Sequence, residues 1–184
     1  MPITPLKRSW TCHWQKSYWR DDINAEFEPL TATGSNVFAA KGVRPGDRLY
    51  VVTISAGQLL FGARMTVEAV ITRTQAVQRL DTDDLYEDAK WWAVGAPGLC
   101  TPLNLHRQLE PALTRRLWFV SPQGPPKRLK FVSETHLDGQ TTRGVRQLTP
   151  DSAELLERVL AFSDGKGRSR TMRSISWENV APGA

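Results

Sequence analysis

The chain has 184 residues, of which 40% are hydrophobic and 23% charged, and its formal net charge is +5. These values exclude a disordered chain, and the length suffices for one domain with a sizeable core. No apolar run approaches the roughly 20 residues of a membrane span, and the first residues lack the apolar core of a signal peptide. With only two cysteines, we expect a soluble cytoplasmic protein without a disulfide framework.

Basic and aromatic residues are distributed unevenly. Seven tryptophans occur, and Trp10, Trp14 and Trp19 fall within ten residues. Tryptophan is usually core, but its faces also stack on bases. The cations gather at Arg115 and Arg116, 127–130, Arg143 and Arg146, and 166–173. Such clusters attract polyanions, so nucleic acid is the predicted partner, with a plain solvated surface as the alternative.

The first predicted element is a strand in "WTCHW", where Trp10, Cys12 and Trp14 share one face. A short helix over 37–41 follows, with Ser35 or Asn36 as its cap and Gly42 at its end. "RPGD" then predicts a type II turn, since Pro and Gly occupy its central positions.

An antiparallel hairpin is predicted from "RLYVVTI" and "LLFGARMTVEAVIT", joined at Gly57. In the second strand, alternation places Phe61, Ala63, Met65, Val67, Ala69 and Ile71 on one face. Gly62 interrupts this strand and indicates a bulge or a close backbone approach.

The second half is predicted from shorter signals. We expect a helix that Thr74 caps and that runs through Ala76, Val77 and Leu80. We expect another that starts at Asp83 and carries Tyr86, Ala89 and Trp92. The other expected elements are a loop over 95–105, strands over 115–121 and 128–133, and a helix after the N-cap Thr149. The sum is an α+β protein, a small, mixed, mostly antiparallel β-barrel flanked by helices. Its domain would span 1–163, and 164–184 would be a basic tail or an added strand.

Three motifs in residues 9–72 resemble the EVE branch of the PUA-like superfamily. "WTCHWQKSYW" has Trp14 followed by Lys16 and Ser17, as in the Trp-bearing first strand and Lys-Ser of that pattern. "GSNVFAAKGVRPGDRLYVV" is similar to its Asn-bearing loop, short helix and Gly-Asp turn, and Gly-Ser-Asn also resembles YTH domains. "LLFGARMTVEAV" is similar to the next strand. The resemblance implies a PUA-like barrel and is loose after residue 72.

The resemblance implies a non-enzymatic reader of nucleic acid. EVE and YTH domains take one modified base of DNA or RNA into an aromatic-lined pocket, and EVE-like modules are often associated with bacterial defence against modified DNA. By this resemblance DNA is favoured over RNA, and an effector nuclease or another defence protein would be a partner. No cofactor, catalytic residue or metal is expected.

Matched residue by residue, Trp14 would supply one face of the pocket, and Ser35 and Asn36 would bond the edge of the base. Thr33-Gly34-Ser35 stands where the family has a Trp before its Asn, so another aromatic would supply the second face. The candidates for that face are Trp10, Trp19 and Trp118. The candidates for phosphate binding are Lys16, Ser17, Arg20 and Arg64.

Each of these residues has a plainer interpretation as well. Trp14 could be core, Asn36 could cap the helix that follows it, and the cations could be solvated. Two other functions also stay open. One is an ASCH-like enzyme, a nuclease or small-molecule hydrolase, in which Lys16, Tyr50 and Glu68 converge. The other is a protein-interaction module.

Signals for metal or nucleophilic chemistry are weak. Cys12 and His13 are adjacent and point to opposite faces of a strand, so they cannot pair directly. Cys100, His106 and His136 have no metal-ligand spacing. The polar stretch "ETHLDGQTTRG", residues 134–144, is a candidate functional loop or a support for the barrel.

Overall fold

Two long neighbouring strands, β3 (Arg48–Ser55) and β4 (Gln58–Thr72), form the predicted antiparallel hairpin at the centre of the fold. Both are rich in β-branched and apolar residues, which suit a pleated sheet that is covered on both faces. Gly57 takes a positive φ in the turn, as predicted. The computed structural model describes residues 7–21, 26–165 and 171–183.

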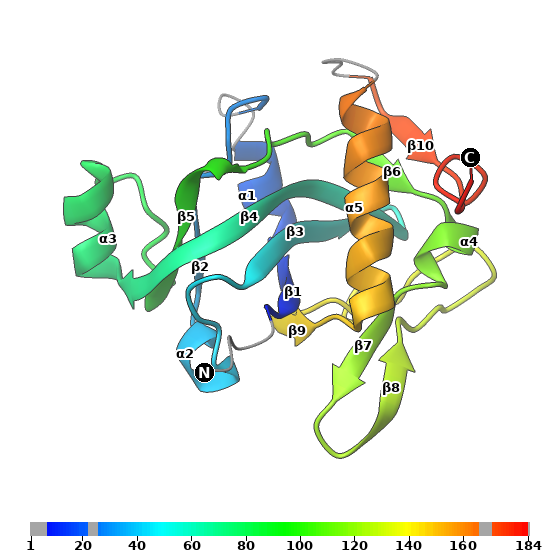
Figure 1. Ribbon diagram of the computed structural model, residues 1–184, viewed down its shortest axis with the longest axis horizontal. Coiled ribbons are helices and arrows are strands. Elements are labelled where there is room, and N and C mark those ends of the chain that lie inside the picture. Colours follow the sequence, from blue (N-terminus) through cyan, green and yellow to red (C-terminus); the bar gives the residue numbers. More distant parts are fainter. Residues whose placement is uncertain (1–6, 22–25, 166–170, 184) are drawn as a thin grey trace, which may run out of the picture.

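Around this hairpin the chain builds a curled, mixed sheet (Figure 1). Its order is β10-β6-β4-β3-β1-β9, and β5 pairs with β4 and also with β2. The β1–β3 and β6–β10 pairs are parallel, and the other pairs of this sheet are antiparallel. The remaining strands of this sheet are β1 (Ser9–His13), β2 (Ala32–Ser35), β5 (Trp91–Cys100), β6 (Arg107–Leu109), β9 (Val145–Gln147) and β10 (Arg173–Ile175).

The described residues also form five helices and a separate two-stranded ribbon. The helices are α1 (Lys16–Asp21), α2 (Phe38–Lys41), α3 (Arg73–Leu80), α4 (Pro111–Thr114) and α5 (Pro150–Asp164). The ribbon pairs β7 (Trp118–Ser121) with β8 (Gly124–Arg128). In the same residues, no helix is long and apolar enough to cross a membrane. The architecture is therefore α+β, as predicted. Its strands curl into a half-barrel.

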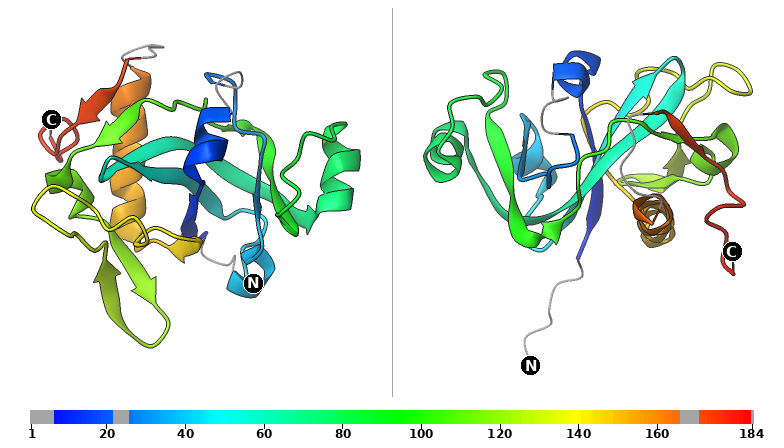
Figure 2. Two further views of the ribbon diagram at one scale, coloured as in Figure 1. Left: turned by 180° about the vertical axis from the view of Figure 1, so that it is seen from behind. Right: turned by 90° about the horizontal axis from the view of Figure 1, so that it is seen from above.

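Two cores lie on opposite faces of the hairpin. Tyr50 and Val52 of β3 join the cluster under α5, whereas Leu49 and Val51 join the cluster that contains Trp10, Trp14 and Trp19. This alternation follows from the two-residue period of a strand. Seen from above, α5 lies end-on outside the curl and α1 lies over its open side (Figure 2, right).

The face predicted for β4 is wrong at its start, because Gly62 is a bulge. Val51 pairs with Ala63 and Val52 pairs with Phe61, so Gly62 is the extra residue. An extra residue reverses the alternation. Phe61 therefore packs under α5, while Ala63 and Met65 pack in the other core.

Two predictions between residues 73 and 105 are also wrong. The segment from Asp83 to Trp92 is not a helix, and 95–100 is not a loop, since β5 runs from Trp91 to Cys100 beside β4. Tertiary pairing with β4 and β2 decides this segment, and it overrides local turn and helix signals. The helix that precedes it begins two residues earlier than predicted, because its N-cap is Thr72 rather than Thr74, and Thr72 and Gln75 form a capping box.

The C-terminal half follows the prediction more closely. The helix after Thr149 is α5, with Pro150 at its first position. The strand predicted over 128–133 is misplaced, because β8 runs from Gly124 to Arg128, between the two predicted strands. Pro125 and Pro126 are tolerated there because the ribbon has open edges. In the segment predicted as a tail or an added strand, β10 joins β6 and Ile175 is buried in the core.

Candidate functional site

Trp14 follows β1, where two backbone bonds fix the chain. The His13 N–H donates to Gly144 O at 3.0 Å, and the Trp14 N–H donates to Val52 O at 2.9 Å. The indole Nε1–H donates to Thr33 Oγ1 at 2.8 Å, and the residue is 5% exposed. Trp14 is therefore a core residue that presents only a small part of its ring to a cavity.

Three nearly parallel aromatic rings lie beside Trp14. Tyr18 on α1 stacks on Tyr86 with 4.0 Å between ring centroids and 25° between planes. Tyr86 in turn stacks on Trp92 of β5, at 6.0 Å and 28°. Trp14 meets Tyr86 edge-on, at 6.5 Å and 81°. We call Tyr18, Tyr86 and Trp92 the aromatic column.

The Gly-Ser-Asn stretch positions Tyr86 by holding the segment that follows it. A Cβ on Gly34 would lie 2.5 Å from Ala89 Cβ, so only glycine allows this close approach. Asn36 Oδ1 accepts from the Lys90 N–H at 2.8 Å. This bond leaves the Asn36 side-chain NH₂ as a donor. Ser35 Oγ accepts from the Val37 N–H at 3.3 Å. The prediction that Ser35 or Asn36 caps the short helix is wrong, because the N-cap of α2 is Val37 and no side chain bonds there.

These elements enclose a small open hollow, which we call the aromatic pocket. Its volume is about 150 Å³, a size that holds one benzene-like ring. Asp88 and Asn36, both exposed, supply a carboxylate and an amide at its rim. The lining residues are His13, Trp14, Gln15, Tyr18, Gly34, Ser35, Asn36, Tyr86, Asp88 and Ala89.

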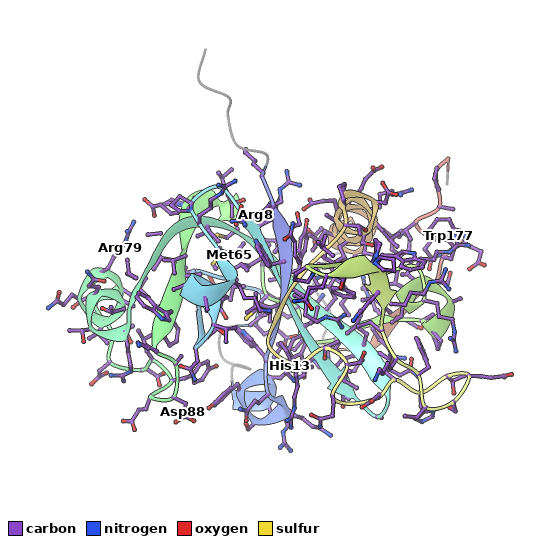
Figure 3. The ribbon with its side chains drawn as sticks, turned by 90° about the horizontal axis from the view of Figure 1, so that it is seen from below. Arg8, His13, Met65, Arg79, Asp88 and Trp177 are labelled. Carbon is purple, nitrogen blue, oxygen red and sulfur yellow. The ribbon has the colours of Figure 1, made fainter. Side chains whose placement is uncertain are left out.

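A second hollow, the basic groove, adjoins the aromatic pocket and has a volume of about 560 Å³. The two share His13 and Gln15. Its other lining residues are Lys16, Gly139, Arg143 and Gly144, and no carboxylate is among them. Figure 3 shows His13 and Asp88 at the same edge of the molecule, with α1 between them.

His13 connects the two hollows and is half-buried. Its Nδ1 lies 2.8 Å from Thr142 Oγ1 in the 134–144 segment. Burial lowers the pKa of His13 below its usual value, and the positive charge of Arg143 lowers it further. The imidazole is thus neutral at pH 7, and the cations of the groove are Lys16 and Arg143.

The other predicted stacking residues do not line the aromatic pocket. Trp10 lies at the opposite end of β1 and donates from Nε1 to Asp47 Oδ2 at 3.0 Å. Trp19 is buried, and its Nε1–H donates to Leu105 O at 3.1 Å. Trp118 lies on β7 beneath the guanidinium of Arg128. Trp14, Ser35 and Asn36 are the predicted base-binding residues that the structure brings together.

Of the predicted phosphate ligands, three lie at or near the basic groove and one does not. Lys16 lines the basic groove, and Ser17 and Arg20 are exposed on the same short helix. Arg64 lies on the far face of β4, where it meets Glu157 of α5 at 3.4 Å. Arg64 is therefore a structural ion pair between the sheet and α5.

The three residues proposed for an enzyme do not converge. The Tyr50 hydroxyl donates to Glu157 at 2.7 Å, and Glu68 pairs with Arg79 at 2.6 Å, whereas Lys16 lines the groove. Burial raises the pKa of the Cys12 thiol to about 12, so Cys12 is no nucleophile at neutral pH. Across the described ranges, no three His, Cys, Asp or Glu side chains are grouped to hold a metal ion.

Tyr18, Tyr86 and Asp88 belong to the pocket, and sequence reasoning missed all three. The sequence predicts Tyr86 on a helix that does not form, and no motif points to Tyr18. Tyr86 lies in a segment whose course depends on contacts with Gly34 and Asn36, and Tyr18 lies on a helix of only six residues, so neither has a periodic signal.

Comparison of the chain with protein-family models, curated proteins and solved structures gave no match. The resemblance to EVE domains therefore stays a prediction from the motifs.

Proposed function

We propose that this protein binds nucleic acid by taking one base into the aromatic pocket and the adjoining phosphate into the basic groove. The observation that carries the proposal is that the two hollows adjoin, sharing His13 and Gln15. One is lined by aromatic rings, and the other is lined by two cations without a carboxylate. A nucleotide likewise has an aromatic base beside an anionic phosphate, so each of its parts matches one of the two hollows. The half-barrel of strands is compatible with a PUA-like barrel, which we propose as its fold type.

The chemistry of each part suits a base. A base entering the pocket would extend the aromatic column, and stacking contributes about 1–3 kcal/mol per base. The Asn36 NH₂ would donate to the base edge, and the Asp88 carboxylate would accept from it. Extruding a base from a duplex costs a few kcal/mol, which is about what stacking returns. The pocket therefore favours a base that is already unpaired or mismatched.

The test uses fluorescence anisotropy with a single-stranded oligonucleotide and the same strand carrying an abasic site. Tyr18→Leu removes the end of the aromatic column that faces the pocket, and it should weaken binding of the intact strand about tenfold, the equivalent of about 1.4 kcal/mol of lost stacking. The abasic strand should bind the wild type as weakly as the intact strand binds the variant. Equal affinity of the wild type for both strands would rule out the base pocket.

A second variant tests the reading of the base edge. Asn36→Asp keeps an oxygen to accept from the Lys90 N–H but replaces the NH₂ donor with an acceptor. We expect unchanged stability and weaker binding. Asn179→Asp is the matched control, since Asn179 Oδ1 also accepts a backbone N–H, from Ser176 at 3.1 Å, far from the pocket in the sequence. Equal losses in the two variants would show an effect of charge alone.

A second candidate function rests on the acidic side chains near Tyr86. Asp83, Asp84, Glu87 and Asp88 occur within six residues, and aromatic rings beside carboxylates suit a quaternary ammonium group. A trimethyllysine peptide tests it directly. Binding of this peptide that Asp88→Asn weakens, without competition from oligonucleotides, would favour this candidate over the base pocket.

A further inference from the structure

The ribbon of β7 and β8 projects from the body of the molecule (Figure 1). All five residues of β8 are exposed, and Val120 on β7 is 41% exposed. The ribbon is anchored at its base, where the Thr149 N–H donates to Trp118 O and Phe119 is buried. Most of its surface is thus available to a partner.

The ribbon and its flanks form a basic segment. Between Arg115 and Ser133 there are five cations and no carboxylate. The formal net charge of the whole chain is also +5. The charge of this segment is therefore as large as the net charge of the protein. The cations are Arg115, Arg116, Lys127, Arg128 and Lys130.

Three of these arginines are held against aromatic rings. The guanidinium of Arg128 lies 4.1 Å from the Trp118 ring centroid. Arg115 lies 3.8 Å from Phe131, and Arg116 lies 3.7 Å from Trp177. Stacking restricts these side chains before any partner binds, which lowers the entropy lost on association.

The ribbon is unsuited to adding a further strand. Pro125 and Pro126 lack backbone donors, and both lie in β8. Proline at a strand edge blocks edge-to-edge pairing. A partner is therefore held by the ribbon's cationic side chains, as a polyanion would be.

The ribbon is joined to the basic groove by direct contacts. The Lys130 N–H donates to Thr141 Oγ1 at 2.8 Å, in the segment that forms one wall of the groove. Arg146 lies over the Phe119 ring at 4.1 Å and also donates to Thr141 O. Seen from behind, the 134–144 segment (yellow) lies directly above the ribbon, on the left of the molecule (Figure 2, left).

We propose that the β7–β8 ribbon enters the major groove of a B-form DNA duplex that flanks the bound base. This inference rests on the proposed function and names its nucleic acid. The major groove, about 12 Å wide, admits a two-stranded ribbon. The corresponding groove of duplex RNA is deep, narrow and closed to side chains. The ribbon thereby selects DNA over RNA in the duplex next to the base.

The test measures salt-dependent affinity for three probes: a DNA duplex with one mismatched pair, the RNA duplex of the same sequence and a short single DNA strand. Lys127→Gln/Arg128→Gln should reduce the slope of log K against log salt for the DNA duplex by about 2. The short single strand reaches only the aromatic pocket and the basic groove. The affinity of the same double variant for this strand should stay within about twofold of wild type, because distant sites contribute independently.

Lys41→Gln/Arg79→Gln removes the same charges from exposed positions on α2 and α3 and should leave every slope unchanged. Equal slope changes for the DNA and RNA duplexes, or none for DNA, would overturn the ribbon proposal. Failure of the proposed function is separate, because Tyr18→Leu would then leave single-strand binding intact while the ribbon variant still weakened the DNA duplex. Failure of both DNA probes to bind would overturn both proposals.

Discussion

Gly34 and Asn36 shape the aromatic pocket through a segment more than fifty residues away. Gly34 leaves room for Ala89, and Asn36 accepts from the Lys90 N–H. Together they bring the 86–90 segment against β2, and Tyr86 with it. A short polar stretch beside a buried strand is thus explained by packing and hydrogen bonding before any ligand is considered.

The first prediction concerns Gly34→Ala. The new methyl group would lie 2.5 Å from Ala89 Cβ and 3.0 Å from the Trp92 ring, and overpacking of this kind costs about 1–3 kcal/mol. Urea denaturation should show a lower midpoint, and oligonucleotide binding should weaken as Tyr86 moves. Gly124→Ala is the control, since a Cβ there meets nothing within 4 Å. An equal effect of both substitutions would show that Gly34 has no packing role.

The second prediction concerns His13 and pH. Because the folded state lowers the pKa of His13, the unfolded chain takes up the proton first as the pH falls. This contribution to stability is complete above the unfolded pKa of about 6.5 and is lost as the pH falls through the folded pKa. The free energy of unfolding, measured by urea titration across this range, should fall further in the wild type than in His13→Asn. Parallel pH profiles would contradict the assignment.

Among the elements, β4 depends on a single buried arginine. Arg107 of β6 is 1% exposed, and its Nη1 donates to the Phe61 and Gly62 carbonyls at 3.2 and 2.9 Å. These carbonyls flank the bulge, where the ladder with β3 is interrupted. Arg107 therefore donates where the ladder is interrupted, together with the Asn104 N–H, which donates to Gly62 O at 3.0 Å. The Arg107 Nη2 also reaches Asp164 at the end of α5, at 3.2 Å.

The third prediction compares the two ends of this interaction. Arg107→Gln should cost about 2–4 kcal/mol of folding stability, because two buried carbonyls lose their charged donor. Asp164→Asn should cost less than about 1 kcal/mol, because that carboxylate is half exposed and water replaces its partner. Thermal or urea denaturation measures both. A larger loss for Asp164→Asn would show that the ion pair, rather than the bulge, is what Arg107 stabilises.

At the scale of the whole molecule, two cores share one pair of strands. Residues of β3 and β4 alternate between the cluster under α5 and the cluster that contains Trp10, Trp14 and Trp19. Neither cluster can lose its packing without disturbing the strands of the other. We therefore expect the two halves to unfold together.

The fourth prediction tests this coupling with Leu156→Ala on α5. Leu156 is fully buried in the first cluster, and removing such a side chain costs about 2–5 kcal/mol. Trp177 packs against the first cluster, and Trp10, Trp14 and Trp19 lie in the second, so tryptophan fluorescence reports on both cores. Fluorescence and far-UV circular dichroism should give the same lowered midpoint. Separate midpoints would show that the cores are independent units.

The sequence by itself determined the elements that have a local signal. Alternation predicted β3 and β4, Gly57 predicted their turn, and Thr149 with Pro150 predicted the start of α5. The predicted strands and helices together gave the α+β class. The resemblance to EVE domains grouped Trp14, Ser35 and Asn36, and the structure brings them to one pocket; their binding of a base is a proposal.

Only the tertiary structure decided the rest of the site. Tyr86 lies in a segment whose local signals favour a helix, and contacts with β2 and β5 hold it in another conformation. The sequence predicted a bulge at Gly62, but the transfer of Phe61 to the opposite core and the hydrogen bond from Arg107 were decided by the tertiary structure. Burial and pairing energies depend on residues far apart in the sequence, so no local pattern carries them.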